Sequence, residues 1–288
     1  MKEFTDDLDK NINVLSVDDW KNILSSSLAF KYTTKPYDLN PKILYRARPN
    51  FNSDGKPVDF FSHTKELWAP PAKCVGKDGR CNVKGQSTLY CATSVTTTLF
   101  EVRPDTGEEL TFMDYDVTGD ITSLGIVGCK EITLLGDDYN DIFGGHFIEA
   151  SNDAETLDDI LSKVFKTRHS KEYPIYNLTN AVFQTFTDAP KKDIVPDFLK
   201  PPKFNGVIYP SLATDKLLGI NIAMDPDAVK HLLKPFCAYK YKVLKKIDDH
   251  HYEIILTHRT SNISENGELT WTENENAVVE KITDTPQK

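Results

Sequence analysis

The segment from Gly79 to Pro104, GRCNVKGQSTLYCATSVTTTLFEVRP, constrains the fold of this chain more than any other. Its two glycines supply permissive backbone on either side of basic and amide side chains, which predicts a turn that presents hydrogen-bond donors to an anion. Thr88 to Ala92 is short and β-prone and predicts a strand. Thr93 or Ser94 can then cap a helix. The segment is therefore expected to form a turn, a strand and a helix in close succession.

The predicted helix of this segment places an acidic residue where helix electrostatics do not favour one. Its apolar stripe is Val95, Leu99 and Val102, and Glu101 lies off that stripe near the helix end. The helix dipole favours cations at a C-terminus, so a carboxylate there has a small local cost. A functional role for Glu101 would explain that cost.

Composition limits the class of protein. The chain has 288 residues, 39% of them hydrophobic and 27% charged, which predicts a globular protein with either one large domain or a domain with appendages. No apolar run approaches the roughly 20 residues of a membrane span, and the acidic N-terminus MKEFTDDLDK does not resemble a signal peptide, so we expect a cytoplasmic protein with no membrane partner. The net charge of −9 argues against a nucleic-acid binder. A phosphate-bearing small molecule stays compatible, because arginines can cluster locally.

The N-terminal part predicts one helix and one strand. SVDDWKNILSSSLAF has Ser16 as a possible cap and apolar residues at helical spacing, and we expect this helix to pack on the domain. ILYRARP predicts a strand in which Arg46 and Arg48 share one face. That face is either solvated surface or the floor of a pyrophosphate site, and the pattern alone leaves both open.

The middle of the chain is predicted to form a long loop, strands and two helices. Residues 50–84 are rich in turn formers and read as a lid or binding loop. ELTFMDYDV and ITSLGIVGCKEITLL predict a hairpin or adjacent strands. ETLDDILSKVFKTR and IYNLTNAVFQTFTDA predict two helices that cover a sheet. The five cysteines form no Cys-x-x-Cys pair, so no metal site is predicted.

The segment KFNGVIYPSL places a serine at the exit of a buried strand. Val207 to Tyr209 form the predicted strand, Pro210 ends it and Ser211 follows. Residues at strand ends are favoured positions for ligand contact, although a serine that merely ends a strand is the simpler interpretation. No Gly-x-Ser-x-Gly elbow surrounds Ser211, which argues against a hydrolase nucleophile. Further strands are predicted before residue 258, and the remaining residues are polar and acidic and predict a ragged or partner-binding tail.

Three motifs together resemble the RES family, named for an arginine, a glutamate and a serine. They are LYRARP, the central GRCNVKGQSTLYCATSVTTTLFEVRP, and FNGVIYPS with GINIAMDP, and they span roughly residues 40 to 245. The resemblance places the family's three residues on Arg80, Glu101 and Ser211, and an early arginine and a tyrosine on Arg46 and Tyr90. The chain departs from the compact family core at Cys81, where the family often has an aromatic or small apolar residue, and in its two terminal extensions.

The resemblance implies a fold and an activity. RES proteins are similar in fold to ADP-ribosyltransferases, so we expect an α+β protein with a split, mixed β-sheet, flanking helices and NAD in a cleft. The expected organisation is a helical extension (1–40), a catalytic domain (41–258) and an acidic tail (259–288). Several family members are toxins that destroy NAD and are held in check by an antitoxin. The implied activity is cleavage of the nicotinamide–ribose bond by hydrolysis or phosphorolysis, with NAD as substrate, no further cofactor, and a neutralising partner or a homo-oligomer as compatible assemblies.

Each motif residue then has an expected role. Glu101 would stabilise positive charge on the ribose, and Arg80, assisted by Arg46, would clamp the pyrophosphate. Tyr90 offers a ring for stacking and Ser211 a hydroxyl for orientation.

Arg48 and Asn82 are weaker candidates for binding NAD. Every one of these residues also has a simpler structural interpretation, as a loop cation, an exposed helix residue, a core ring or a strand terminator. Two other functions stay open: transfer of ADP-ribose to a macromolecule, and an inactive module that binds a nucleotide or scaffolds a complex.

Overall fold

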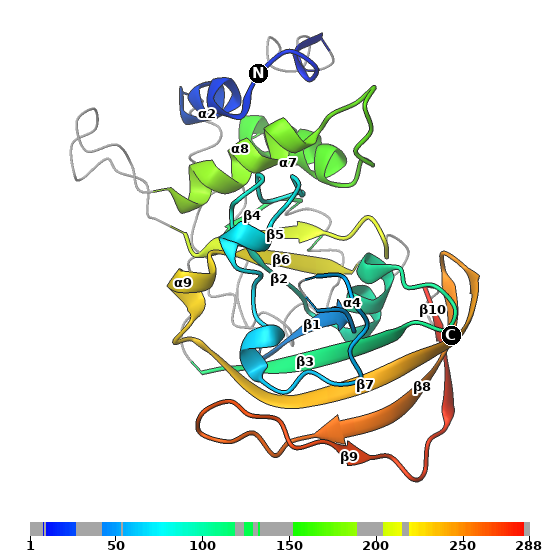
Figure 1. Ribbon diagram of the computed structural model, residues 1–288. Coiled ribbons are helices and arrows are strands. Elements are labelled where there is room, and N and C mark those ends of the chain that lie inside the picture. The colour runs from blue at the N-terminus through cyan, green and yellow to red at the C-terminus, as the bar shows by residue number, and fades with distance from the viewer. Residues whose placement is uncertain are drawn as a thin grey trace.

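The chain folds as an α+β protein around one large mixed sheet (Figure 1). The computed structural model describes residues 8, 10–26, 42–52, 54–118, 124–128, 132, 152–188, 204–214 and 219–284. Within these residues the sheet has ten strands, in the order β10-β8-β7-β3-β1-β2-β6-β5-β4, with β9 paired to β8. Neighbouring strands are antiparallel except β4 and β5, which are parallel. The predicted α+β class with a mixed sheet is therefore confirmed.

The strands differ widely in length. Their bounds, in sheet order, are β10 (Val279–Thr283), β8 (His251–Thr260), β7 (Leu233–Asp248), β3 (Glu109–Val117), β1 (Ile43–Pro49), β2 (Leu89–Ala92), β6 (Ile220–Met224), β5 (Gly206–Pro210), β4 (Leu124–Ile126) and, beside β8, β9 (Thr272–Glu273). The short strands β5 and β6 are buried throughout, whereas the long strand β7 contains buried, partly buried and exposed residues.

The sheet divides into two halves between β1 and β2. Strand β1 pairs with β3 along its whole length, but its pairing with β2 is confined to Tyr45 opposite Ala92. Arg46 spans the opening beyond that pair: its Nη1 donates to the carbonyl of Tyr90 in β2 at 2.9 Å, and its Nε donates to the carbonyl of Leu67 at 3.0 Å. A side chain thus replaces backbone pairing at the joint between the two half-sheets.

Helices pack on both half-sheets. In Figure 1 the helices α2 (Val17–Ser26), α7 (Asn152–Phe165) and α8 (Tyr176–Thr187) gather beside β4, β5 and β6. Trp20, Leu161 and Phe183 from these helices are buried in one cluster with Val207 of β5 and Ala223 of β6. The other helical elements are α4 (Val95–Val102), α9 (Pro226–Val229) and the 3₁₀ helices η1 (Thr64–Glu66) and η2 (Ala72–Cys74). The prediction that the two helices after residue 152 cover a sheet is confirmed.

The N-terminal helix α2 packs on α8, as the sequence predicts. Ser16 caps it, because its hydroxyl accepts from the backbone N–H of Asp19 at 3.2 Å while the Asp19 carboxylate accepts from the Ser16 N–H at 3.0 Å. Lys21 reaches from α2 to the carboxylate of Asp188 at 2.5 Å. The rest of the predicted extension, residues 1–7, 9 and 27–40, lies outside the described residues.

The C-terminal segment is part of the sheet. The expected boundary at residue 258 falls within β8, and both β9 and β10 pair with β8 in antiparallel register. Asp284, directly after β10, is 1% exposed. The polar composition misled the prediction of a ragged or partner-binding tail, because β10 is an edge strand and three of its five residues are exposed.

One further prediction about the scaffold was wrong, and one alternative of a second was wrong. β3 and β4 are neither a hairpin nor adjacent: β3 pairs with β1 and β7, whereas β4 pairs with β5 at the far edge. The segment 50–84 is no separate lid, because Phe61 and Leu67 are buried in the core and the indole N–H of Trp271 donates to the carbonyl of Phe61 at 2.8 Å. The other alternative, a binding loop, stays a prediction. Turn-forming composition does not distinguish a lid from a loop that carries core side chains.

Candidate functional site

A cavity of about 310 Å³ lies at the joint between the two half-sheets. Its wall contains the charged and amide side chains Arg46, Arg80, Glu101 and Asn221, and the rings of Tyr90, Tyr176 and Tyr209. These residues come from β1, the turn before β2, β2 itself, α4, α8, β5 and β6. The structure therefore brings together four of the residues that the sequence predicted, which are Arg46, Arg80, Tyr90 and Glu101.

Glu101 reaches the cavity from the last turn of α4. Ser94 caps this helix, since its hydroxyl accepts from the N–H of Thr97. The Oε1 atom of Glu101 accepts two hydrogen bonds, from the hydroxyl of Ser211 at 2.5 Å and from Nδ2 of Asn221 at 2.6 Å. The Oε2 atom has no hydrogen bond to any described residue. One carboxylate oxygen is thus fixed by the protein and the other is available to a ligand.

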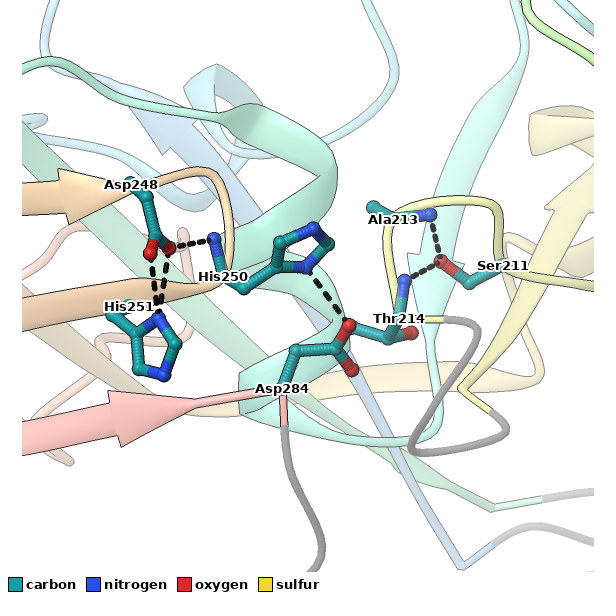
Figure 2. A network of polar contacts seen from close by, with 7 residues as sticks. All are labelled: Ser211, Ala213, Thr214, Asp248, His250, His251 and Asp284. Atoms are coloured by element: carbon teal, nitrogen blue, oxygen red, sulfur yellow. Dashed lines mark hydrogen bonds and ion pairs between the residues drawn. The ribbon is translucent and has the colours of Figure 1, made fainter.

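Ser211 supports Glu101 from behind the cavity wall. It is 1% exposed, and its Oγ accepts from the backbone N–H groups of Ala213 at 3.1 Å and Thr214 at 3.3 Å, as Figure 2 shows. Because these two donors occupy the lone pairs of the hydroxyl, its own proton is directed to the Glu101 carboxylate. The predicted role of Ser211 in orientation therefore has a specific target, which is Glu101.

His250 and His251 do not form a hydrolase triad with Ser211. His250 Nδ1 lies 3.1 Å from Oδ2 of the buried Asp284, and His251 Nδ1 lies 2.8 Å from Asp248 (Figure 2). In the described part of the chain, no histidine makes a hydrogen bond to the Ser211 hydroxyl. The structure gives no support for Ser211 as an activated nucleophile.

Asn221 is a site residue that the sequence interpretation missed. It lies in β6, opposite Ala92 of β2 and Tyr209 of β5, and is 6% exposed. The available signal was an amide inside the apolar run INIAM, because a buried amide needs hydrogen-bond partners and its partner here is a carboxylate.

Arg80 has donors that the protein leaves unused. Its Nη2 donates to the carbonyl of Thr167 at 3.3 Å, whereas its Nη1 is buried and has no partner among the described residues. The preceding Gly79 is required by close packing, since a Cβ there would lie 2.4 Å from Oδ1 of Asn82. A buried guanidinium nitrogen without a partner is costly, and an anionic ligand would satisfy it.

Asn82 and Tyr90 hold this turn in place. The Tyr90 hydroxyl accepts from the N–H of Cys81 at 2.7 Å and donates to Oδ1 of Asn82 at 2.9 Å. Burial raises the pKa of Tyr90 well above its ordinary value, so the hydroxyl remains protonated. Asn82 is 8% exposed and is absent from the cavity wall. It therefore shapes the Arg80 turn, while the ring of Tyr90 lines the cavity.

Arg48 is separate from the cavity. Its Nη2 donates to the carbonyl of Phe51 at 3.1 Å, its Nη1 donates to the carbonyl of Glu66, and its guanidinium lies 4.8 Å from the ring centroid of Phe61. These contacts attach the loop after β1 to the sheet. The structure thus distinguishes two arginines that the strand pattern placed on one face.

The charge of the wall suits a ligand with both anionic and cationic groups. Among the described lining residues, Glu101 is the one carboxylate, and Arg46 and Arg80 are the two cations. No group of three histidine, cysteine, aspartate or glutamate residues within the described ranges could hold a metal ion. Likewise, none of the described helices is long and apolar enough to cross a membrane.

Comparisons of the chain with protein-family models, with curated proteins and with solved structures found no match. The resemblance to the RES family therefore stays a prediction based on the three motifs. The fold and the site define the chain as an α+β protein with a charged cavity at the joint of a divided sheet.

Proposed function

We propose that this chain is an enzyme that cleaves the bond between nicotinamide and ribose in NAD, with Glu101 as the catalytic residue. The observation that supports this most is the carboxylate of Glu101, fixed through one oxygen by Ser211 and Asn221 in a cavity that also contains two arginines. NAD has the matching charge pattern, because a cationic nicotinamide ring and an anionic pyrophosphate lie on either side of one ribose.

The chemical step needs a fixed negative charge. As the bond between ribose C1′ and the nicotinamide nitrogen breaks, its electron pair goes to the ring nitrogen and positive charge develops on the ribose. A carboxylate held beside C1′ favours this transition state over the ground state. Two donors on Oε1 keep Glu101 from rotating, so little reorganisation is needed when the charge appears.

The leaving group explains why one carboxylate suffices. Nicotinamide departs as a neutral molecule because its ring nitrogen is cationic in NAD, so no acid has to protonate it. A glycosidase that expels an oxygen needs a second carboxyl group as an acid. Within the described cavity wall Glu101 is the one carboxylate, which suits a substrate whose leaving group is cationic before the bond breaks and neutral afterwards.

The acceptor completes the reaction. Water attacking C1′ and losing a proton to solvent yields ADP-ribose, whereas phosphate yields the corresponding 1-phosphate. A macromolecular acceptor would make the chain a transferase. The role of this chain as a toxin with a neutralising partner is proposed from the motif resemblance alone.

Growth of cells that express the chain tests this role. An active NAD-cleaving enzyme should arrest growth when expressed, and its Glu101→Ala variant should not.

The decisive experiment measures NAD loss and nicotinamide release by the purified chain, with and without phosphate in the buffer. The Glu101→Gln variant should lose at least about 100-fold in rate, as expected when a fixed transition-state charge is removed. Glu265→Gln, in an exposed turn, is the matched control and should keep full activity. A wild-type chain that leaves NAD intact after removal of any co-purified ligand would refute the proposal and favour a binding module.

A further inference from the structure

Two aromatic rings extend from the cavity to the protein surface, and the reaction proposed above uses neither. Tyr176, the first residue of α8, lines the cavity and is partly buried. Its ring is stacked on that of His169, with centroids 3.9 Å apart and an interplanar angle of 11°. His169 itself is exposed. The pair therefore forms a flat aromatic wall at the rim of the cavity.

Arg80 lies beside this wall. It donates to the carbonyl of Thr167, two residues before His169, and its buried Nη1 has no partner in the described chain. A guanidinium with an unused donor next to stacked rings is the combination that a nucleotide requires, because the phosphate pairs with the cation and the base stacks on the aromatic surface.

The protonation state of His169 fits this use. Burial, and secondarily the positive charge of Arg80, lower the pKa of His169 below its ordinary value, and Asp78 opposes part of that effect. The imidazole is therefore neutral at pH 7. A neutral ring stacks on a base without repelling the neighbouring guanidinium.

The size of the cavity requires a second contact region for a dinucleotide. Its volume of about 310 Å³ is at the lower end of the range for pockets that enclose one drug-sized ligand, roughly 300–1,000 Å³. A dinucleotide contains two nucleosides, so the cavity encloses one of them and the other must lie outside. The rim formed by Tyr176 and His169 adjoins Arg80, where the linking phosphates would bind.

We propose that the stacked rings of His169 and Tyr176 bind the purine base of a dinucleotide while Arg80 binds the adjoining phosphate. This inference rests on the proposed function, since it takes the nicotinamide ribose to lie beside Glu101. It adds a specificity for the base at the far end of the substrate, and it makes His169 a binding residue that the motif pattern does not include.

The test compares two ligands that differ in the purine. Isothermal titration in the Glu101→Gln background measures binding of ADP-ribose, which has the purine, and of nicotinamide mononucleotide, which lacks it. His169→Ala should weaken ADP-ribose binding about 5- to 10-fold, because base stacking on an aromatic side chain contributes at this level. It should change the Kd of the mononucleotide less than about twofold. His169→Phe, which keeps an aromatic ring, should restore the affinity for ADP-ribose.

Controls keep this test separate from that of the reaction. His251→Ala, at the first residue of β8, should alter neither affinity. Equal weakening of both ligands by His169→Ala, or no weakening of ADP-ribose, would overturn the subsite even if the wild type cleaves NAD. A wild-type chain that binds ADP-ribose with this His169 dependence but leaves NAD intact would keep the subsite and overturn the reaction. Binding of neither ligand would overturn both.

Discussion

Asn221 donates to Glu101 across 2.6 Å, although the two residues are 120 positions apart in sequence. The same Oε1 atom also accepts a hydrogen bond from the hydroxyl of Ser211, which directly follows β5, the strand next to that of Asn221. A strand residue and the residue at the exit of the neighbouring strand thus hold one carboxylate oxygen of a helix residue, and the other oxygen is left without a described partner. The arrangement separates two tasks, because the strands fix the orientation and the helix supplies the charge.

Asn221 is therefore predicted to act as a positioning residue. Asn221→Ala removes one of two donors to Glu101 and should lower kcat for NAD cleavage about 10- to 100-fold with little change in KM, as for loss of one preorganised donor. Asn221→Asp places a second carboxylate in contact with Glu101, so the acidic limb of the pH–rate profile should move to higher pH. Asn266→Ala, in an exposed turn, is the control. An unchanged profile in Asn221→Asp would contradict the positioning role.

The arginines should separate into binding and structural groups. Arg80→Ala removes the cation with the unused donor and should raise KM roughly 10-fold or more, with a small effect on stability. Arg48→Ala leaves the carbonyls of Glu66 and Phe51 without their donor and should lower the free energy of unfolding by about 1–3 kcal/mol with KM unchanged. Steady-state kinetics and urea unfolding of both variants measure the two effects. A raised KM in Arg48→Ala would show that Arg48 reaches the substrate.

The sequence predicted local structure well and strand neighbours poorly. The strand before α4, the Ser94 cap and the exit position of Ser211 depend on short-range backbone preferences, which the local pattern contains. The separation of β3 from β4 depends on pairings between strands that are far apart in sequence, such as Glu109 of β3 with Lys242 of β7 and Leu124 of β4 with Gly206 of β5, and no local pattern contains them.

The candidate site shows the same limit. Arg80 and Glu101 were predicted as site residues from the order of the motifs. Arg46 lines the cavity and Arg48 does not, and this difference depends on which backbone carbonyls the fold brings within reach of each side chain. Asn221 was missed because its carboxylate partner lies in another element. A single buried amide in an apolar strand is a signal that a second polar group faces it, but the sequence does not say which one.

The C-terminal strand should be required for stability and for the Ser211 turn. Ala213, two residues after Ser211, packs in one cluster with Tyr252 and Ile254 of β8, and Ile282 of β10 packs against it. Deleting residues 278–288 exposes that cluster and the edge of β8, so the free energy of unfolding should fall by at least about 2 kcal/mol, the scale of one buried isoleucine. Deleting only 285–288 is the control. A full deletion with wild-type stability and NAD turnover would show that β10 is dispensable.

Asp114 should make stability depend on pH. It lies in β3 opposite Tyr45 and is 5% exposed, and burial raises its pKa to about 7, although a hydrogen bond with Tyr239 opposes part of the rise. Because the folded chain holds this proton more tightly than the unfolded chain, the free energy of unfolding should fall as the pH rises from about 4 to about 7.

Asp114→Asn tests this dependence. The amide stays neutral at every pH in this window, so the stability of the variant relative to the wild type should rise by about 2–3 kcal/mol between pH 5 and pH 8. Urea unfolding at the two pH values measures the difference. Asp116→Asn, two residues along the same strand and exposed, is the matched control and should follow the wild type. If Asp114→Asn shows the same fall in stability between pH 5 and 8 as the wild type, a different group titrates in this range.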